Sequence, residues 1–454
     1  MKKELCVQKL IIEGLHGVYS YDLDFKSNLN ILYGENGSGK STVLHIIANI
    51  LNWDFAKFVS LNFQYIYAFF DDQSYIEIIR FKDDNDDDAH FFITGGYKDS
   101  SEKLNFSESE AIDLLKGVNK DRGIITFEKE ITHPLQKRID KFCHQTRLKK
   151  VNTSYFPAFR TMLEAWSHKK SPNQVESFAR EIFGHFLPQL NYPTPVFVEE
   201  SLGRQYHRAL YNLSEKENEI FSASFLKMLS KVTNKSSVPI HDAINTIEKF
   251  ELHSKKYLNS ISLESSSKIN AILESVKNLC KEEAEGENDS LSGALEVYLE
   301  ALEEINLYKY NLFSKIDTFI NNVNFFLKNK KLKCSIEPLD EDRESSNTKL
   351  AYSRVRVGFD VGTKELCKSI DLSSGERQIL TMLWAVNQVV DNTVVLIDEP
   401  EISLHIDWQE DLIKKMGDGL KSCQLIICTH SPAIAADYDG YMQEVKPTLL
   451  KHGK

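Results

Sequence analysis

The residues of this chain best suited to chemistry lie in one short glycine-rich segment, 34–42. It reads Gly-Glu-Asn-Gly-Ser-Gly-Lys-Ser-Thr and matches the phosphate-binding pattern GxxxxGK[ST]. Glycines at these positions let backbone N–H groups close around a phosphate at a helix N-terminus. We expect Lys40 to reach the β- and γ-phosphates of a nucleoside triphosphate and Ser41 to complete the coordination of Mg²⁺. The expected ligand-binding residues of this loop are Asn36, Gly37, Ser38, Gly39, Lys40, Ser41 and Thr42.

A pair of carboxylates supplies a second half for such a site. The apolar run 394–397, Val-Val-Leu-Ile, ends in Asp398 and Glu399, which is a Walker B pattern. Asp398 is expected to hold Mg²⁺, and Glu399 to orient or deprotonate the attacking water. Adjacent residues of a strand point to opposite faces, so both carboxylates serve one site only at a strand end, which is where they occur.

Two further segments carry groups that suit a phosphate site. Leu372–Glu376, Leu-Ser-Ser-Gly-Glu, precedes a helix that begins near Arg377, and its small residues suit a second phosphate contact. His430 follows another apolar strand and places an imidazole at its carboxyl end. A lone histidine is more often structural, but the order of all four motifs along the chain argues against coincidence. The segment Glu401–His405, just after the carboxylates, suits a loop that contacts another subunit.

The elements that position these groups follow from hydrophobic patterning. A helix is expected from Thr42 to Leu51, directly after the glycine-rich segment. Strands with aromatic and β-branched residues, some separated by polar turns typical of a β-meander, are expected before and after it. They are Leu5–Ile12, Tyr19–Phe25, Leu29–Tyr33, Gln64–Phe70, Tyr75–Phe81, His90–Thr94 and Asn152–Phe156.

Between about 170 and 330 the pattern becomes helical. Apolar residues recur at steps of three or four over Leu291–Leu327, which predicts a helix roughly 55 Å long whose stripe needs a partner helix from this region or another subunit. Strand character then returns at Lys333–Pro338, Val355–Val361, Thr393–Ile397 and Gln424–Cys428. We therefore expect an α/β fold with a large helical insertion, divided into 1–165, 166–332 and 333–454.

Composition fits a soluble globular protein. The 454 residues are 42% hydrophobic and 27% charged, and the net charge of −11 does not by itself indicate nucleic-acid binding. No apolar stretch approaches the ~20 residues that span a bilayer, and no signal peptide is seen, so we expect a cytoplasmic location. The seven scattered cysteines form no CxxC pair, which disfavours a zinc site or a disulfide scaffold.

One local stretch departs from the acidic balance. Between Lys137 and Lys170 nine basic residues face only two acidic ones, Asp140 and Glu164. This density could neutralise several phosphates of a nucleic acid. It is equally consistent with a solvated helix face whose charge is offset by acidic neighbours in space.

Taken together, the motifs resemble those of ABC-type ATPase heads of the SMC, RecF and OLD branch. The resemblance covers about residues 1–165 and 333–437. It implies a RecA-like core sheet with an antiparallel β-meander. Leu372–Glu376 is similar to the ABC signature LSGGQ, with Ser374 in place of the first glycine and Glu376 in place of glutamine. In that family two heads enclose two ATP molecules, which implies that the signature residues Ser373, Gly375 and Glu376 act on ATP held by the opposite subunit. It also implies that His430 contacts the γ-phosphate within its own subunit.

Two features refine this resemblance. The glutamine loop of the family has no match after the strand ending at Phe156, so Arg160 or a neighbour substitutes for it, or the coupling differs, and no residue is assigned. The run Glu399–His405 resembles the EPE-x-x-LH pattern of OLD-like ATPases. OLD nucleases continue into a Toprim domain, whereas only 24 residues follow His430 here, so a nuclease is expected to be a separate protein.

An OLD-like ATPase with a helical insertion and no nuclease resembles PtuA, the ATPase subunit of Septu and retron-linked anti-phage systems. This implies a switch-like ATPase whose partners are a second copy of itself and an HNH-type nuclease, with a retron reverse transcriptase and its RNA and DNA as a further partner. The alternative is a RecF- or SMC-like repair ATPase that clamps DNA when ATP is bound. An inactive scaffold is disfavoured by the intact Lys40, Asp398, Glu399 and His430. A transporter subunit is disfavoured by the missing glutamine and the large insertion.

Overall fold

We describe the protein from a computed structural model. It describes residues 5–449 apart from 84–86, 98–99, 121–132, 147, 161, 164–171, 191–192, 232–288, 339–352, 364, 388–392 and 418–422. Its packing divides the chain into two compact units: Met1–Thr194 with Thr381–Lys454, and Pro195–Leu380. The three-part division with boundaries after 165 and 332 stays a prediction.

The first unit contains a five-stranded sheet in which each neighbouring pair of strands is parallel. Its strands in spatial order are β13 (Met442–Glu444), β3 (Leu29–Tyr33), β12 (Cys423–Thr429), β11 (Thr393–Asp398) and β8 (Asn152–Phe156). Cys428 is in register with both Asp398 and Leu32, so the carboxyl ends of three strands meet at one edge. The expected strands are confirmed for β3, β8, β11 and β12, whereas the short β13 was not expected.

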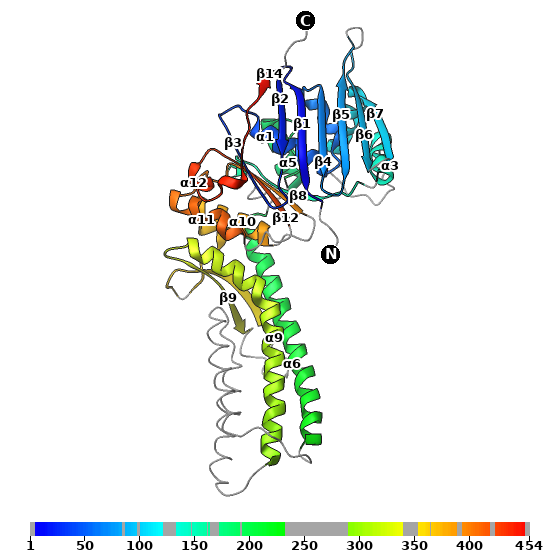
Figure 1. The fold of residues 1–454 in the computed structure, drawn as a ribbon. Helices are drawn as coiled ribbons and strands as arrows, with labels where there is room; N and C mark the ends of the chain where they lie inside the picture. The colour runs from blue at the N-terminus through cyan, green and yellow to red at the C-terminus, as the bar shows by residue number, and fades with distance from the viewer. Residues whose placement is uncertain are drawn as a thin grey trace. The chain divides into compact units, whose positions relative to one another are not determined.

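A seven-stranded antiparallel sheet, blue to cyan in Figure 1 apart from β14, forms the rest of the scaffold of this unit. In spatial order it contains β14 (Thr448–Leu449), β2 (Tyr19–Asp24), β1 (Val7–Leu15), β4 (Tyr65–Phe70), β5 (Ser74–Phe81), β6 (His90–Tyr97) and β7 (Ser100–Ser107). Buried and more exposed residues alternate along β4, which leaves one face for the core. The expected β-meander is confirmed.

The outer edge of this sheet differs from expectation. Strand β6 continues through Gly95 and Gly96 to Tyr97, and β7 was not expected because only Leu104 and Phe106 of its eight residues are buried. A β-carbon on Gly95 would lie 2.8 Å from the ring of Phe142. Glycine therefore allows helix α3 (Pro134–Gln145) to approach the sheet closely at this strand.

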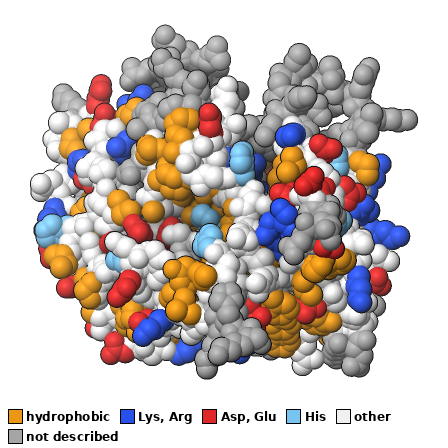
Figure 2. All heavy atoms as spheres, turned by 90° about the horizontal axis from the view of Figure 1, so that it is seen from above, with side chains coloured by type: hydrophobic (Ala, Val, Ile, Leu, Met, Phe, Trp, Pro, Cys, Tyr) orange, Lys and Arg blue, Asp and Glu red, His pale blue; other side chains and the backbone are white. Residues whose placement is uncertain are grey.

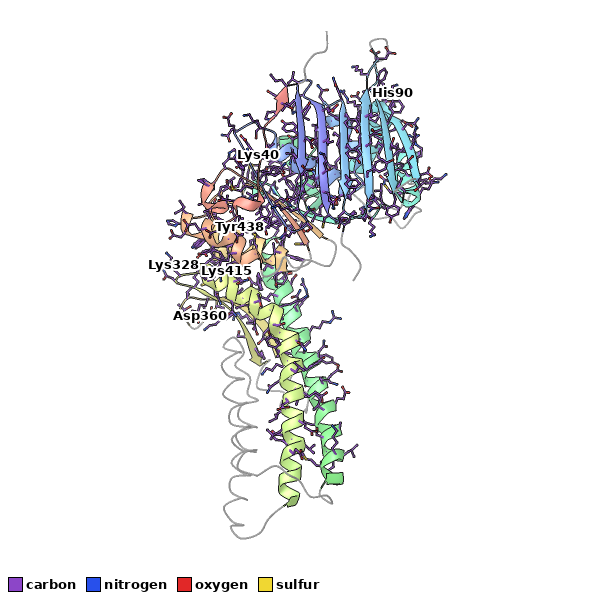
Figure 3. The ribbon with its side chains drawn as sticks, viewed as in Figure 1. Lys40, His90, Lys328, Asp360, Lys415 and Tyr438 are labelled. Carbon is purple, nitrogen blue, oxygen red and sulfur yellow. The ribbon has the colours of Figure 1, made fainter. Side chains whose placement is uncertain are left out.

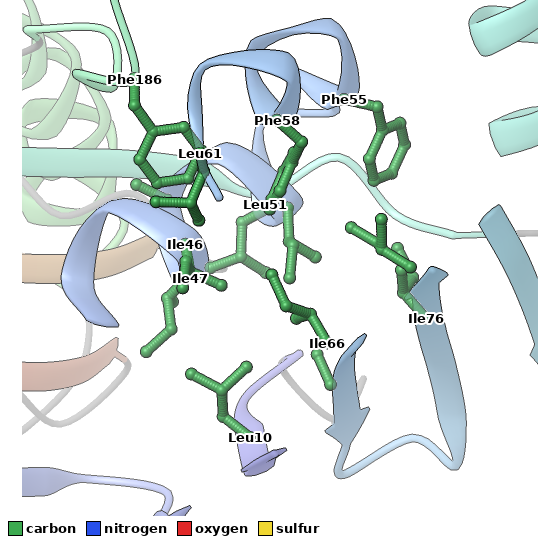
Figure 4. Close-up of a cluster of buried hydrophobic side chains, with 14 of the residues drawn as sticks. Leu10, Ile46, Ile47, Leu51, Phe55, Phe58, Leu61, Ile66, Ile76 and Phe186 are labelled. Carbon is green, nitrogen blue, oxygen red and sulfur yellow. The ribbon is translucent and has the colours of Figure 1, made fainter. Parts of the chain in front are cut away.

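Helix α1 (Lys40–Leu51) connects the two sheets of the first unit. Its residues Ile46, Ile47 and Leu51 pack with Leu10 and Ile66 of the antiparallel sheet (Figure 4). The same helix contacts β8, β11 and β12 of the parallel sheet. Since each buried Ile or Leu side chain stabilises the fold by roughly 1.5–3 kcal/mol, this helix is firmly fixed at the carboxyl end of β3.

The second unit is built on two long antiparallel helices, α6 (Pro195–Lys231) and α9 (Asp289–Phe326). Tyr206 of α6 meets Phe313 of α9 with ring centroids 5.5 Å apart, and Phe221 meets Tyr298 at 6.3 Å. The expected long helix is confirmed, and α6 is a partner helix that packs along it. The hairpin of β9 (Lys331–Pro338) and β10 (Ser353–Asp360) follows α9.

The remaining elements of the described residues are short. They are the helices α2 (Glu108–Lys120), α5 (Pro172–Phe183), α10 (Ser374–Asn387), α11 (Ile406–Gly417) and α12 (Pro432–Ala435), and the 3₁₀ helices η1 (Phe55–Ser60), η4 (Ser369–Asp371) and η6 (Asp439–Tyr441). Over the described residues the fold is therefore α/β, with one parallel sheet, two antiparallel sheets and a long helical segment. The α/β fold with a long helical segment agrees with the sequence prediction.

Candidate functional site

The glycine-rich segment forms the turn between β3 and α1. Gly39 is the residue before the helix and has φ +87°, and a β-carbon there would lie 2.7 Å from the hydroxyl oxygen of Tyr21. Both the backbone conformation and the space therefore require glycine. Asn36 and Gly37 are exposed on this turn, Ser38 is buried, and Ser41 and Thr42 are half-buried.

The side chain of Lys40 is folded into the same turn. Its ammonium donates hydrogen bonds to the carbonyl oxygens of Gly34 and Glu35, both at 3.0 Å, and lies 3.5 Å from Oγ of Ser38. Only 5% of the residue is exposed (Figure 3 labels its position). The positive charge thus lies within the loop, where a phosphate bound by the backbone N–H groups would meet it.

Asp398 ends strand β11 beside the first turn of α1. Burial raises its pKa to about 6, although a hydrogen bond from Ser41 and the charges of Arg160 and Lys40 lower it. Its Oδ1 is buried and has no hydrogen-bond partner among the described residues. A carboxylate oxygen left over beside a serine hydroxyl fits one side of a Mg²⁺ shell, whose other positions phosphates and water would fill.

Glu399 and His430 face each other at the ends of neighbouring strands. The distance from Nε2 of His430 to Oε1 of Glu399 is 3.8 Å, and both side chains are about one-third exposed, at 32% and 34%. Glu399 has φ +48°, and its N–H donates to the carbonyl oxygen of Cys428 at 2.8 Å. The turn out of β11 is therefore fixed to β12, and both side chains are open to solvent.

Arg160 has a role that the sequence did not reveal. It is fully buried, and its guanidinium donates to the carbonyl oxygens of Pro157 at 3.0 Å, Asp398 at 3.1 Å and Glu399 at 3.2 Å. It lies in the segment where a glutamine was expected, but it contacts the backbone of the turn after β11. It therefore makes no contribution to a basic surface.

Fewer of the other basic residues between Lys137 and Lys170 are available for a basic surface than the sequence suggests. Arg138 of α3 pairs with Glu110 at 2.9 Å and donates to the carbonyl oxygen of Asn105 at 2.7 Å. Lys137 and Lys141 are exposed, whereas Arg147 and 164–170 lie outside the described residues. On the face shown in Figure 2, Lys and Arg side chains are interspersed with Asp and Glu. A nucleic-acid contact through this stretch stays a prediction.

The signature-like segment belongs to the second unit, where it begins α10. The N–H of Ser373 donates to Oε2 of Glu376 at 2.7 Å, and Lys330 donates to the same oxygen at 2.9 Å. Burial raises the pKa of Glu376, but these hydrogen bonds outweigh it and hold the pKa below its usual value. Glu376 thus caps its own helix, in the manner of a capping box. The expected action of Ser373, Gly375 and Glu376 on a second subunit stays a prediction.

Of the predicted site residues, the structure brings together those of the first unit. Five of them lie at the carboxyl edge of the parallel sheet: Lys40, Ser41, Asp398, Glu399 and His430. This is the edge at which α/β proteins bind ligands.

Across the described ranges, no helix is long and apolar enough to cross a membrane.

Such a glycine-rich turn, lysine and pair of strand-end carboxylates define a nucleotide-binding protein of the P-loop class. A family model named "AAA ATPase domain" matches residues 6–435, and the chain belongs to that family. The protein is accordingly an ATPase of this family, with ATP as its expected ligand.

Two curated relatives match shorter stretches. The chain is 31% identical over 121 residues to "Retron Ec83 probable ATPase" from Escherichia coli, which covers 24% of this chain and 21% of the relative. It is 24% identical over 151 residues to "Retron Vc95 probable ATPase" from Vibrio cholerae serotype O1 biovar El Tor. This match covers 29% of the chain and 28% of the relative. The matches thus span less than a third of either relative.

Solved structures with similar features include an Smc head domain with an extended coiled coil from Pyrococcus furiosus. It is 11% identical to this chain. The match covers 98% of this chain and 96% of the Smc chain, with a TM-score of 0.40. The structure of the recombination mediator RecF is 13% identical to this chain. The match covers 94% of this chain and 93% of RecF, with a TM-score of 0.30. Scores of this size carry no conclusion about function.

Proposed function

We propose that this chain binds ATP with Mg²⁺, pairs with a second copy around the nucleotide, and hydrolyses ATP to control a partner nuclease in anti-phage defence. The observation that carries the proposal is the meeting of Lys40, Asp398, Glu399 and His430 at one sheet edge. The loop supplies N–H groups for the phosphates, Lys40 a charge for the β- and γ-phosphates, and Ser41 with Asp398 the metal contacts.

In this mechanism Glu399 prepares the attacking water and His430 stabilises charge on the γ-phosphate. Both side chains are about one-third exposed, so solvent water reaches them. Hydrolysis would then release the paired heads, and slow turnover suits such a switch.

The defence role has separate support. It rests on the resemblance of the Glu399–His405 run to OLD-like ATPases and on the similarity to two retron ATPases over part of the chain. The nuclease partner, with or without a reverse transcriptase and its nucleic acid, follows from that resemblance.

The first test concerns ATP binding by calorimetry with Mg²⁺ present. Lys40→Ala is expected to weaken binding at least about a hundredfold, since a desolvated charge-assisted contact of roughly 3 kcal/mol is lost. Lys333→Ala is the control, because this lysine pairs with Asp360, which has no part in the proposed site. Unchanged binding by Lys40→Ala would show that the site is assigned wrongly.

The second test concerns the partner. Tagged Glu399→Gln protein is isolated from its native cells, and mass spectrometry identifies what it retains. A co-purifying nuclease supports the defence role. Retention of duplex DNA and repair proteins without a nuclease would instead support the RecF- or SMC-like clamp, whose DNA binding should need ATP and weaken steeply with salt.

A further inference from the structure

Glu401 extends its carboxylate from the turn after β11 to the loop after β12. Its Oε1 accepts three hydrogen bonds: from Oγ1 of Thr429 at 2.9 Å, from the N–H of His430 at 2.6 Å and from the N–H of Ser431 at 3.1 Å. One carboxylate oxygen thus binds three consecutive residues. Charge-assisted bonds of this kind are roughly twice as strong as neutral ones.

A second link ties the same two loops together. Ser431 begins α12, where its Oγ accepts the N–H of Ala433 at 3.2 Å and donates to Oε1 of Gln409 at 2.6 Å. Gln409 in turn donates to the carbonyl oxygen of Leu404 at 2.9 Å. The loop that carries His430 is therefore attached to the segment after β11 at two points.

These contacts fix the backbone of His430 and leave its imidazole uncommitted to the loop. The ring nitrogen Nε2 lies 3.8 Å from Glu399. The two glutamates of the Glu-Pro-Glu run therefore face different partners: Glu399 faces the histidine ring, and Glu401 holds the histidine backbone.

We infer that Glu401 is a positioning residue, which places the imidazole of His430 for its contact with the γ-phosphate. The inference rests on the proposed ATPase function and adds to it a residue that does not touch the nucleotide. It also assigns a task to the second glutamate of the Glu399–His405 run, in which only Glu399 had a chemical role.

Two substitutions of Glu401 separate its role as a hydrogen-bond acceptor from the effect of its negative charge. All three groups bound to Oε1 are donors, so glutamine keeps the acceptor in a neutral and weaker form. The other oxygen, Oε2, is buried and has no hydrogen-bond partner among the described residues, so an amide nitrogen there breaks no hydrogen bond of Glu401. Alanine removes all three bonds.

The experiment compares kcat and KM for ATP in five proteins: wild type, Glu401→Ala, Glu401→Gln, His430→Ala and the Glu401→Ala/His430→Ala double variant. Glu401→Ala is expected to lower kcat about as much as His430→Ala, roughly ten- to a hundredfold, with KM changed less than about threefold. Glu401→Gln should recover most of the rate. The double variant should be no slower than His430→Ala, because one residue acts through the other.

Hydrogen–deuterium exchange supplies a readout that does not depend on activity. In Glu401→Ala the amides of 430–431 should exchange at least about tenfold faster than in wild type, and in Glu401→Gln they should stay protected. If Glu401→Ala does not fold, Glu401→Asp replaces it, since the shorter side chain loses the reach to His430.

Two results would overturn the inference. One is a folded Glu401→Ala protein with wild-type exchange at 430–431, and the other is a rate loss that adds to that of His430→Ala. A wild-type protein that neither binds nor hydrolyses ATP would overturn the proposed function instead, and the exchange data would still decide what Glu401 holds.

Discussion

At the scale of the residue, Lys40 and Asp398 are charged groups placed in poorly solvated positions. Lys40 satisfies its ammonium with loop carbonyl oxygens, and burial raises the pKa of Asp398 to about 6. Desolvated charges interact more strongly with a ligand than solvated ones do. A phosphate near Lys40 and a cation near Asp398 would therefore each offset part of the desolvation cost of these two charges.

Ser41 offers a direct test of the metal site. Ser41→Ala removes the hydroxyl that donates to Asp398, and it should raise the Mg²⁺ concentration for half-maximal ATPase activity at least about tenfold. Titration of activity with Mg²⁺ measures this. Ser38→Ala is the comparison in the same loop, because its Oγ lies 3.5 Å from Nζ of Lys40 and it is Ser41 whose hydroxyl bonds to Asp398. Equal Mg²⁺ dependence in Ser41→Ala and wild type would remove Ser41 from the metal site.

His45 gives a pH dependence of stability. Burial lowers its pKa from 6.5 to about 4, and its Nε2 lies 2.7 Å from the hydroxyl oxygen of Tyr155. Between pH 6.5 and 4 the unfolded chain binds a proton at this residue and the folded chain does not, so stability falls as pH falls. From pH 7 to 5 this residue should cost the wild type about 2 kcal/mol. Urea unfolding of wild type and His45→Gln at both pH values isolates the effect, and equal losses in the two proteins would contradict it.

The residues predicted from sequence and those missed differ in a physical way. Lys40, Asp398 and His430 act through side chains next to a recognisable glycine-rich turn or apolar strand, so their types and spacing indicate them. Arg160 and Glu401 act on the backbone of distant segments: the carbonyl oxygen that Arg160 binds in Asp398 is 238 positions away. Nothing in local patterning shows such a contact. The Glu-Pro-Glu run was the available signal for Glu401.

At the scale of the element, the turn after β11 depends on Arg160. The guanidinium of Arg160 donates to several carbonyl oxygens, and the single ammonium of Arg160→Lys cannot reach all of them. This substitution should therefore destabilise the fold by roughly 2–4 kcal/mol and lower kcat. Thermal unfolding and ATPase rates measure both effects. Arg138→Lys is the matched control, since its pair with Glu110 is exposed and should change stability by under about 1 kcal/mol. If both variants lose the same small amount, Arg160 does not fix the turn.

Elements with a strong period were predictable, and weakly patterned ones were not. Strand β3 and helix α1 are rich in apolar residues, and their bounds agree with expectation to within two residues. Strand β7 is mostly polar because it lies at the sheet edge, where few of its side chains reach the core. The continuation of β6 through two glycines depends on the packing of α3, which is tertiary information.

At the scale of the whole molecule, the four sequence motifs divide between two compact units. The glycine-rich turn, carboxylates and histidine belong to the first, and the signature-like segment begins a helix of the second. In the proposed function, that segment completes the site of another copy. ATP is therefore expected to control the oligomeric state. Ser373→Arg should block pairing by ATP and should weaken ATP binding only by the part that pairing contributes, because the two equilibria are linked. Light scattering and calorimetry test the two parts separately, and a Ser373→Arg protein that still pairs would place the contact elsewhere.

The most direct measurement is the mass of Glu399→Gln in solution, by light scattering, with Mg²⁺ and with or without ATP, beside its rate of ATP hydrolysis. The account predicts that ATP doubles the mass from 52.1 kDa, that hydrolysis falls at least about a hundredfold, and that adding Lys40→Ala abolishes the doubling. A Glu399→Gln protein that keeps the wild-type rate, or whose mass is the same with and without ATP, would contradict the claim that this site binds ATP between two copies and hydrolyses it.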